Sequence, residues 1–284
     1  MLYCDAHFHA CCCPELAGTG RNAPAAAENG PFRDSFRDEN TLSDGADRFF
    51  AASCAHDREE FERQEQLVQA SGGHILPLFG MHPQLPLLEN ADYMEELLRD
   101  RRIIGIGETG FDLFTPEFRA KLQAQEEAWQ TSLALAARYQ VPVVVHDRKA
   151  LDFIFRDAGK LRGLPAVIFH SFAFGPREAR SVLQHGIHAY FSVAKQILNG
   201  NKKSRACVKD LPLDCLLLET DAPYQTLRGE ERTSPFEIRR VYAEAALIRD
   251  MPPDELAAPL QENFTAAFGI RHSRLFPPAP SRKL

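Results

Sequence analysis

The sequence lacks the features that mark membrane-bound or secreted proteins. No apolar run approaches the roughly 18 residues that a membrane-spanning helix needs, and the chain does not open with a basic segment followed by an apolar one. The seven cysteines are odd in number and show no paired spacing, so a disulfide framework is not indicated. We therefore expect free thiols, a reducing cytoplasmic setting and no membrane partner.

An excess of positive charge is also missing. The net charge is −6 at neutral pH, which argues against a protein that coats duplex DNA electrostatically. Phosphate chemistry stays open, because a bound metal ion can supply positive charge locally. One short basic run, Lys202-Lys203-Ser204-Arg205, is either a solvated face or a contact for a nucleic-acid backbone.

The apolar residues that are present suffice for one large core. Hydrophobic residues make up 44% of the 284 residues and charged residues 25%, as in ordinary globular proteins. (β/α)8 barrels routinely reach this length as one unit, and the sequence shows no internal repeat. We expect a single domain over residues 1–284, with a long loop insertion at 10–47 and a disordered tail at 277–284.

Eight short apolar runs alternate with helical segments. The runs cover residues 1–9, 48–53, 74–79, 103–107, 141–145, 166–169, 189–192 and 215–218. Capping signals at Asp57 and Ser234 open helices, and Thr115-Pro116 is expected to open one long helix that reaches Tyr139. Alternating strands and helices favour an α/β fold with a parallel sheet, and eight such units close into a (β/α)8 TIM barrel.

The first apolar run carries a pattern that could bind a metal ion. Asp5, His7 and His9 alternate with apolar residues, so on an extended strand they share one side, with Tyr3 further back on it. Two imidazoles and a carboxylate at a strand end suit a divalent cation such as zinc or manganese. The alternative is an apolar amino-terminal strand that merely ends in polar residues. The pattern therefore gains weight only from ligands on other strands.

Such ligands follow the other strands. His82, Glu108, His146, His170 and Asp221 each stand at or just past the end of an expected strand. Every strand of a barrel ends on the same face, so these side chains would converge there. Each one alone has a simpler explanation, such as a histidine bonded to a backbone carbonyl. Together, without a cation, they would cost several kcal/mol in desolvation and repulsion.

Six motifs surround these residues. They are Asp5-Ala-His7-Phe-His9, Gly80-Met-His82-Pro83, Gly107-Glu108-Thr-Gly110-Phe-Asp112, Pro142-Val-Val-Val-His146-Asp-Arg148, His170-Ser-Phe and Glu219-Thr-Asp221-Ala-Pro-Tyr224. Together and in this order they resemble the signatures of the TatD family, which are metal-dependent hydrolases of the amidohydrolase superfamily. The resemblance covers residues 1–9 and 48–270 and implies a TIM barrel of the metallo-dependent hydrolase type.

The resemblance also implies a centre for one or two divalent metal ions. The implied ligands are His7, His9 and Asp221 for the first ion, His146 and His170 for the second, and Glu108 as the bridge between them. Mixed imidazole and carboxylate ligation suits zinc or manganese better than magnesium alone.

Further roles are implied for residues around the metal ions. A hydroxide held between the ions would be the nucleophile, with Glu108 and Asp221 as the catalytic residues and Asp221 accepting or orienting the proton. His82 and Arg148 would bind the substrate phosphate. Asp5 would stand behind the ligands and fix one of their imidazoles.

The function implied is that of a deoxyribonuclease that cleaves phosphodiester bonds, with single-stranded DNA or a small phosphoester as substrate. One alternative is a hydrolase of a small amide or ester, since barrel function lies in the loops. Another is a non-catalytic metal-binding barrel. No feature of the sequence sets the oligomeric state.

Three departures from the family pattern bear on the substrate and leave the expected metal ligands intact. The segment 10–47 is long, Ala10 replaces the usual leucine, and Asp147 replaces a small hydroxyl residue. The consecutive residues Cys11 to Cys13 also lie beside His9. Because neighbouring residues cannot all face one ion, we expect only adventitious metal binding there.

Overall fold

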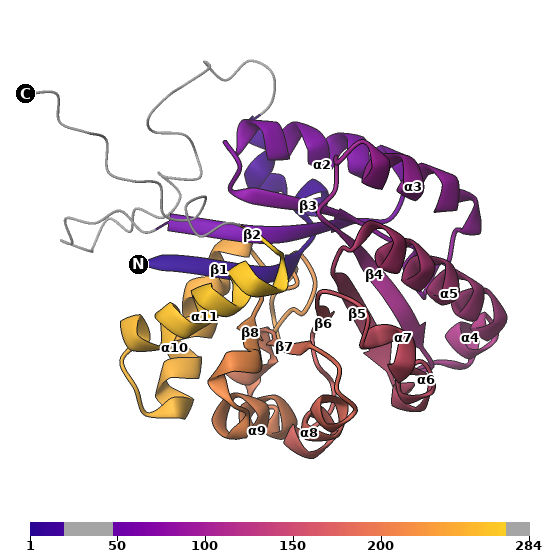
Figure 1. The fold of residues 1–284 in the computed structure, drawn as a ribbon. Helices are drawn as coiled ribbons and strands as arrows, with labels where there is room; N and C mark the ends of the chain where they lie inside the picture. Colours follow the sequence, from indigo (N-terminus) through magenta and orange to yellow (C-terminus); the bar gives the residue numbers. More distant parts are fainter. Residues whose placement is uncertain (20–47, 271–284) are drawn as a thin grey trace, which may run out of the picture.

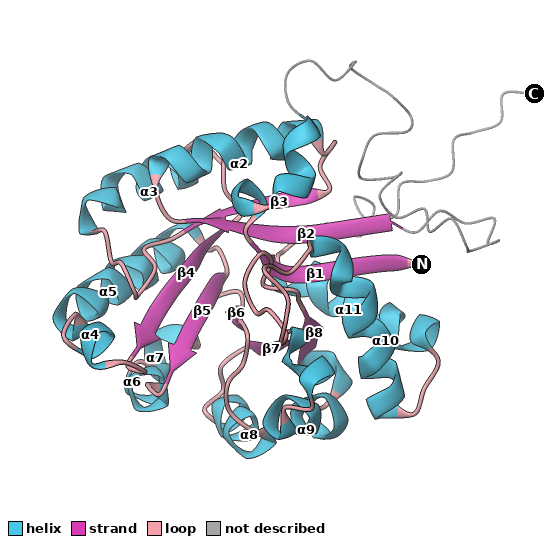
Figure 2. Ribbon diagram, turned by 180° about the vertical axis from the view of Figure 1, so that it is seen from behind, coloured by secondary structure: helices cyan, strands magenta, loops and turns pink. Residues whose placement is uncertain are grey.

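Eight parallel strands follow one another in sequence order around a nearly closed barrel, with helices on its outside (Figures 1 and 2). The computed structural model describes residues 1–19 and 48–270. The strands are β1 (Leu2–Phe8), β2 (Arg48–Ala55), β3 (Ile75–Phe79), β4 (Gly105–Asp112), β5 (Val143–Arg148), β6 (Val167–Phe169), β7 (Ala189–Val193) and β8 (Leu216–Leu218). The (β/α)8 barrel expected from the sequence is confirmed.

The first strand meets the chain just after the last one. The backbone N–H of Asp221 donates to the carbonyl of His7 (3.0 Å), and that of His9 donates to the carbonyl of Ala222 (2.8 Å). These two bonds bring the end of β1 against the segment that follows β8. Two polar stretches from opposite ends of the sequence therefore lie side by side.

The outer layer consists mainly of helices. They are α2 (Arg58–Ala70), α3 (Ala91–Arg99), α4 (Pro116–Arg119), α5 (Leu122–Tyr139), α6 (Leu151–Arg156), α7 (Ala158–Leu161), α8 (Pro176–Gln184), α9 (Lys202–Asp210), α10 (Ile238–Arg249) and α11 (Pro253–Ala267). Short 3-10 helices join them: η1 (Ala10–Cys12), η2 (Pro14–Thr19), η3 (Leu88–Asn90), η4 (Lys195–Asn199), η5 (Leu213–Cys215) and η6 (Pro235–Glu237). Asp57 caps α2 by accepting from the backbone N–H of Glu60 (2.8 Å), as its sequence signal predicts.

Apolar side chains form an inner and an outer core. The inner set fills the barrel with residues such as Leu78, Val144 and Ile168, joined by Phe264 of α11. The outer set packs beneath the helices. This division leaves the carboxyl ends of the strands as the place where polar side chains gather.

Strand β1 does not alternate regularly. The prediction that Tyr3 lies on the same side of this strand as His7 is therefore wrong. Tyr3 belongs to the outer core and packs against Tyr242 of α10, with ring centroids 5.2 Å apart. His7 instead has its Nδ1 atom 3.5 Å from the Sγ atom of Cys54, which belongs to the inner core. The register of β1 against β2 shifts between Asp5 and Phe8. A one-residue irregularity of this kind changes which side chains share a face.

The strands and helices around the next two motifs also differ from expectation. Strands β4 and β5 continue past their apolar runs, so Glu108 and His146 lie within strands rather than after them. The expected helix from 115 to 139 is divided into α4 and α5. Buried Gln125 holds the joint, because its amide donates to the carbonyl of Phe118 (2.7 Å) and accepts from the backbone N–H of Asp112 (2.9 Å).

The structure describes the basic run in full, the early loop in part and the tail not at all. The basic run 202–205 is helical and opens α9, which Asn201 caps. Residues 10–19 form η1 and η2, whereas the rest of the expected loop 10–47 and the expected tail 277–284 lie outside the described residues. No helix in the described part of the chain is long and apolar enough to cross a membrane.

Candidate functional site

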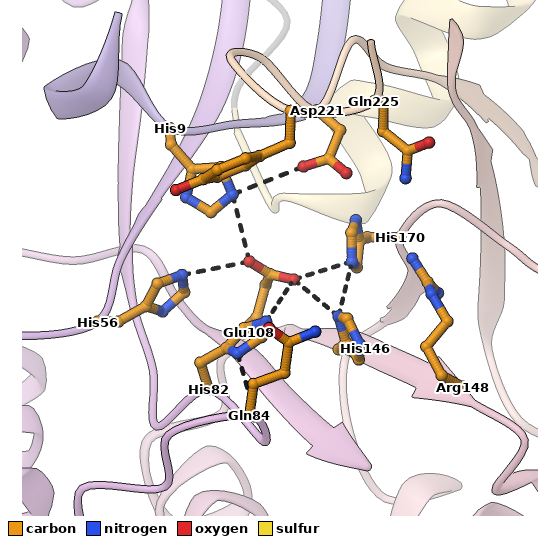
Figure 3. Close-up of a pocket in the computed structure, with 11 residues that line it drawn as sticks. His9, His56, His82, Gln84, Glu108, His146, Arg148, His170, Asp221 and Gln225 are labelled. Atoms are coloured by element: carbon orange, nitrogen blue, oxygen red, sulfur yellow. Dashed lines mark hydrogen bonds and ion pairs between the residues drawn. The ribbon is translucent and has the colours of Figure 1, made fainter. Parts of the chain in front are cut away.

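Polar side chains from seven places in the barrel meet in one pocket of about 430 Å³ (Figure 3). The pocket is lined by His9, His56, His82, Gln84, Glu108, His146, Arg148, His170, Asp221, Tyr224 and Gln225. All of these residues lie near the carboxyl ends of the strands. Of the residues expected from the sequence, only His7 and Asp5 do not line the pocket, and both are fully buried behind it.

Glu108 lies at the centre of the site, between two groups of side chains (Figure 3). Its carboxylate is 2% exposed, and the barrel brings it there because the backbones of neighbouring strands come unusually close. At Gly107, an added Cβ atom would lie 2.5 Å from the Cβ atom of Val144. At Gly80, it would overlap the backbone carbonyl of Glu108. Glycine at these two positions permits the close approach.

In the first group, two carboxylate oxygens lie at nearly equal distances from two imidazole nitrogens. The Nε2 atoms of His7 and His9 lie 3.3 Å apart. Oε1 of Glu108 lies 3.3 and 3.4 Å from them, and Oδ1 of Asp221 lies 3.5 and 3.6 Å from them. Around a tetrahedral zinc ion with bonds of about 2.1 Å, the donor atoms are about 3.4 Å apart. Each carboxylate oxygen therefore has the spacing from both imidazoles that such a cation requires.

The second group surrounds the other oxygen of the same carboxylate. Oε2 of Glu108 lies 2.8 Å from Nε2 of His170, 3.2 Å from Nδ1 of His146 and 3.5 Å from Nε2 of His82. The His146 and His170 atoms are themselves 3.2 Å apart. Glu108 is thus shared by two sets of imidazoles, and both sets fit a divalent cation by their spacing and donor chemistry.

Carboxylates behind the imidazoles orient them. Oδ2 of Asp112 lies 3.0 Å from the Nε2 atom of His146, and Oε1 of Glu219 lies 3.3 Å from the Nδ1 atom of His170. Such partners fix a ring and its tautomer in metal sites. Neither Asp112 nor Glu219 was among the residues selected from the sequence, although both stand in the quoted motifs.

Asp5 supports the site through the backbone. Its carboxylate accepts from the backbone N–H of His7 (3.2 Å) and from the backbone and hydroxyl of Thr220 (3.0 and 2.6 Å). It therefore holds the chain next to two expected ligands rather than touching an imidazole. Asp221 itself adopts a left-handed backbone conformation, with φ of 57°, which an L-residue holds only where the surroundings enforce it.

The charges of the two groups are strongly coupled. Burial would raise the pKa of Glu108, but the surrounding imidazoles, His170 first, outweigh it and hold this pKa well below its usual range. Burial lowers the pKa of His170, yet the Glu108 carboxylate raises it further, to about 10. The same balance applies to Asp221. Burial would raise its pKa, but the hydrogen bond from His9 outweighs burial, and the pKa falls to about 2. Both carboxylates are therefore ionised at neutral pH.

Two other imidazoles are kept neutral. Burial lowers the pKa of His82 to about 3 and also lowers the pKa of His9. A neutral imidazole has a free lone pair, which is the form that binds a metal ion. The site thus combines ionised carboxylates with two neutral imidazoles, while His170 would release its proton when a cation binds.

Several pocket residues were missed by sequence reasoning. His56 follows β2 directly, and its Nε2 atom lies 3.2 Å from Oε1 of Glu108. The strand-end pattern that selected His170 applies equally to His56, so the signal was present. Gln84, Tyr224 and Gln225 carried no such signal, because amide and phenol side chains are common in loops.

A (β/α)8 barrel that gathers imidazoles and carboxylates around a shared glutamate belongs to the class of metal-dependent hydrolases. Within that class, the family described as TatD related DNase matches residues 4–269, and the chain belongs to this family. The resemblance seen in the sequence motifs is thereby confirmed.

Individual relatives agree with this assignment. The chain is 30% identical to a human protein named Deoxyribonuclease TATDN3 over 242 aligned residues, covering 75% of this chain and 81% of the human one. It is 31% identical to the 3'-5' ssDNA/RNA exonuclease TatD of Erwinia amylovora over 221 aligned residues, covering 74% and 85% of the two chains. The crystal structure of YjjV, a TatD homologue from Escherichia coli K12, has the same fold, with a TM-score of 0.72 at 24% identity over 95% and 98% of the chains.

Metal binding should stabilise the folded protein through Glu108. A cation that binds only the folded state adds about 2.7 kcal/mol at a hundredfold excess over its Kd. We expect manganese to raise the unfolding temperature above that in chelator, as measured by calorimetry. Glu108→Gln should abolish most of this rise, whereas Glu59→Gln, at an exposed glutamate on α2, should keep it. An equal rise in all three proteins would contradict the assignment of the centre.

Proposed function

We propose that this protein is a metal-dependent nuclease that hydrolyses phosphodiester bonds at single-stranded nucleic-acid ends. The observation that carries the proposal is the carboxylate of Glu108, shared by two sets of donor atoms at the wall of the pocket. Relatives named as a deoxyribonuclease and as a single-strand exonuclease support the same reaction class.

Two cations would be held by the two groups. His7, His9 and Asp221 would hold one, His146 and His170 the other, and Glu108 would contact both. Bound there, divalent cations lower the pKa of water toward neutrality and neutralise phosphate oxygens. Because imidazoles dominate the ligand set, we propose zinc or manganese rather than magnesium alone.

Asp221 has the position of a proton acceptor. It lies at the pocket wall beside His9, and it is ionised at neutral pH because its pKa is about 2. An ionised carboxylate at this place can accept a hydrogen bond from the attacking water and orient it toward the phosphorus. Its left-handed backbone conformation and the bond from its N–H to His7 fix that orientation.

His82 and Arg148 are proposed to contact the substrate phosphate. Both line the pocket, and Figure 3 shows the Arg148 side chain beside His146 and His170. Its guanidinium donates to the carbonyl of Asp147 (3.1 Å), which holds the side chain in place and leaves further N–H donors for an anion. The neutral His82 can donate one N–H without adding charge.

The shape and chemistry of the pocket mouth favour a single strand. Tyr224 lines the pocket and is 54% exposed, with its ring centroid 5.0 Å from that of His9. An exposed aromatic ring beside a phosphate site is a stacking platform for an unpaired base. A pocket of about 430 Å³ has the size of a small-ligand site and admits the end of a strand, whereas a duplex would require a long basic surface.

We also propose that the protein works in the reducing cytoplasm. All seven cysteines are free, and five of them are buried. Buried free thiols act as small apolar residues and persist where disulfides are not formed.

Cleavage of labelled single-stranded DNA should depend on the metal ions and on Glu108. We expect activity with manganese or zinc that is lost in chelator and restored by added metal. Glu108→Gln should lower kcat/KM on the order of a hundredfold or more, because a bound metal supplies several kcal/mol of transition-state stabilisation. The exposed change Glu59→Gln serves as the control. Hydrolysis of small esters or amides with DNA untouched, or bound metal with no turnover, would refute the nuclease assignment.

Removal of the Tyr224 ring should weaken the cleavage of oligonucleotides more than that of small phosphodiesters. Base stacking is worth about 1–3 kcal/mol, so Tyr224→Ala should raise KM for a single-stranded oligonucleotide about tenfold or more. The kcat/KM for bis(4-nitrophenyl) phosphate, which carries no base, should change little. Tyr224→Phe keeps the ring and should behave like the unaltered protein. If Tyr224→Ala affected both substrates equally, the ring would not be a stacking platform.

A further inference from the structure

A second cluster of side chains that could bind a metal ion lies outside the pocket. Cys11 and Cys12 belong to η1, directly after the expected ligand His9, and Glu60 lies in the first turn of α2. One ligand atom from each of these three residues lies within 4.8 Å of the others. All three side chains are partly exposed, so an ion could reach them from solvent.

The spacing of the two thiols is that of ligands to one ion. Their Sγ atoms are 3.6 Å apart. Around a tetrahedral zinc ion with Zn–S bonds of about 2.3 Å, two sulfur atoms are about 3.8 Å apart. A disulfide would need about 2.0 Å, so the thiols are placed for sharing an ion and not for a bond to each other.

The third consecutive cysteine faces elsewhere. Cys13 is buried, and its thiol donates to the carbonyl of His9 (3.3 Å). The expectation that three neighbouring cysteines cannot all face one ion is therefore correct, but two of them do converge. The 3-10 turn of η1 produces this arrangement by placing the side chains of Cys11 and Cys12 together on the face that packs toward α2.

Glu60 can complete such a site. Its Oε2 atom accepts from the backbone N–H of His56 (2.8 Å), which fixes the carboxylate beside the thiols. The nearby Arg63 pairs with Glu59, one residue away on α2, at 2.5 Å. One oxygen of the Glu60 carboxylate lies within 4.8 Å of both thiols.

We propose that Cys11, Cys12 and Glu60 form a further cation site, for a thiophilic divalent ion such as zinc, separate from the centre at Glu108. The thiols release their protons to solvent when the ion binds, and a fourth coordination position stays open to water. Thiolates select zinc or cadmium over magnesium and manganese. The two sites of this chain therefore differ in which ions they accept.

Occupation of this site would stiffen one side of the pocket mouth. Glu60 holds the backbone of His56, whose imidazole lines the pocket, and η1 begins at His9. An ion bound to η1 and α2 together would fix both residues in place. Only Ala10 separates Cys11 from the pocket residue His9 in the sequence, yet none of the three proposed ligands lines the pocket.

Cadmium titration of the full-length, reduced protein tests the proposal directly. The centre at Glu108 is first filled with manganese, and thiolate-to-cadmium charge-transfer absorption in the ultraviolet is then recorded. We expect a band that saturates at one cadmium ion per chain. Cys11→Ser/Cys12→Ser should abolish the band, and Glu60→Gln should weaken cadmium binding on the order of tenfold or more.

Two controls separate this site from other thiols and from the nuclease proposal. Cys13→Ser removes the neighbouring thiol that faces away and should keep the band, as should Glu108→Gln. Absence of a band in the unaltered protein, its survival in Cys11→Ser/Cys12→Ser, or its loss in Cys13→Ser would overturn the proposal. The readout involves no catalysis, so a protein inactive on DNA could still pass this test.

Discussion

The structure depends on how one buried negative charge is accommodated. The carboxylate of Glu108 is 2% exposed and has six imidazoles within 3.5 Å. A charge removed from water costs several kcal/mol unless it is paired. The lone pairs of neighbouring imidazoles also repel one another. A divalent cation held by the carboxylate and the imidazoles would resolve both problems at once. Metal binding would therefore explain why so many polar side chains can share one end of the barrel.

The rest of the fold keeps the donor atoms in place. Parallel strands deliver side chains from seven parts of the sequence to the same face, and glycines at 80 and 107 let the strand backbones approach closely. The segment after β8, which carries Asp221 and Tyr224, is anchored by the fully buried Lys195. Its Nζ atom donates to Glu230 (2.5 Å) and to Glu237 (2.9 Å). A buried ion pair of this kind is a weak source of stability but fixes the path of a loop.

Much of this arrangement could be predicted from the sequence, because the strongest signals are local. Apolar runs mark the strands, and polar residues at their ends converge by the geometry of the barrel, so Glu108 and its main partners were found. Features that depend on tertiary contacts were not. The register shift in β1 that separates Tyr3 from His7, and the break before α5 held by Gln125, arise from packing between distant segments. His56 was not selected, because the expected strand ends at Ser53 whereas β2 continues to Ala55.

The most direct test of the account is an anomalous diffraction measurement on crystals grown with manganese. The account predicts anomalous peaks on both sides of Glu108, one within bonding distance of His7, His9 and Asp221, and the other beside His146 and His170. It would be contradicted by a map in which the pocket is well ordered and no manganese ion lies within bonding distance of the Glu108 carboxylate.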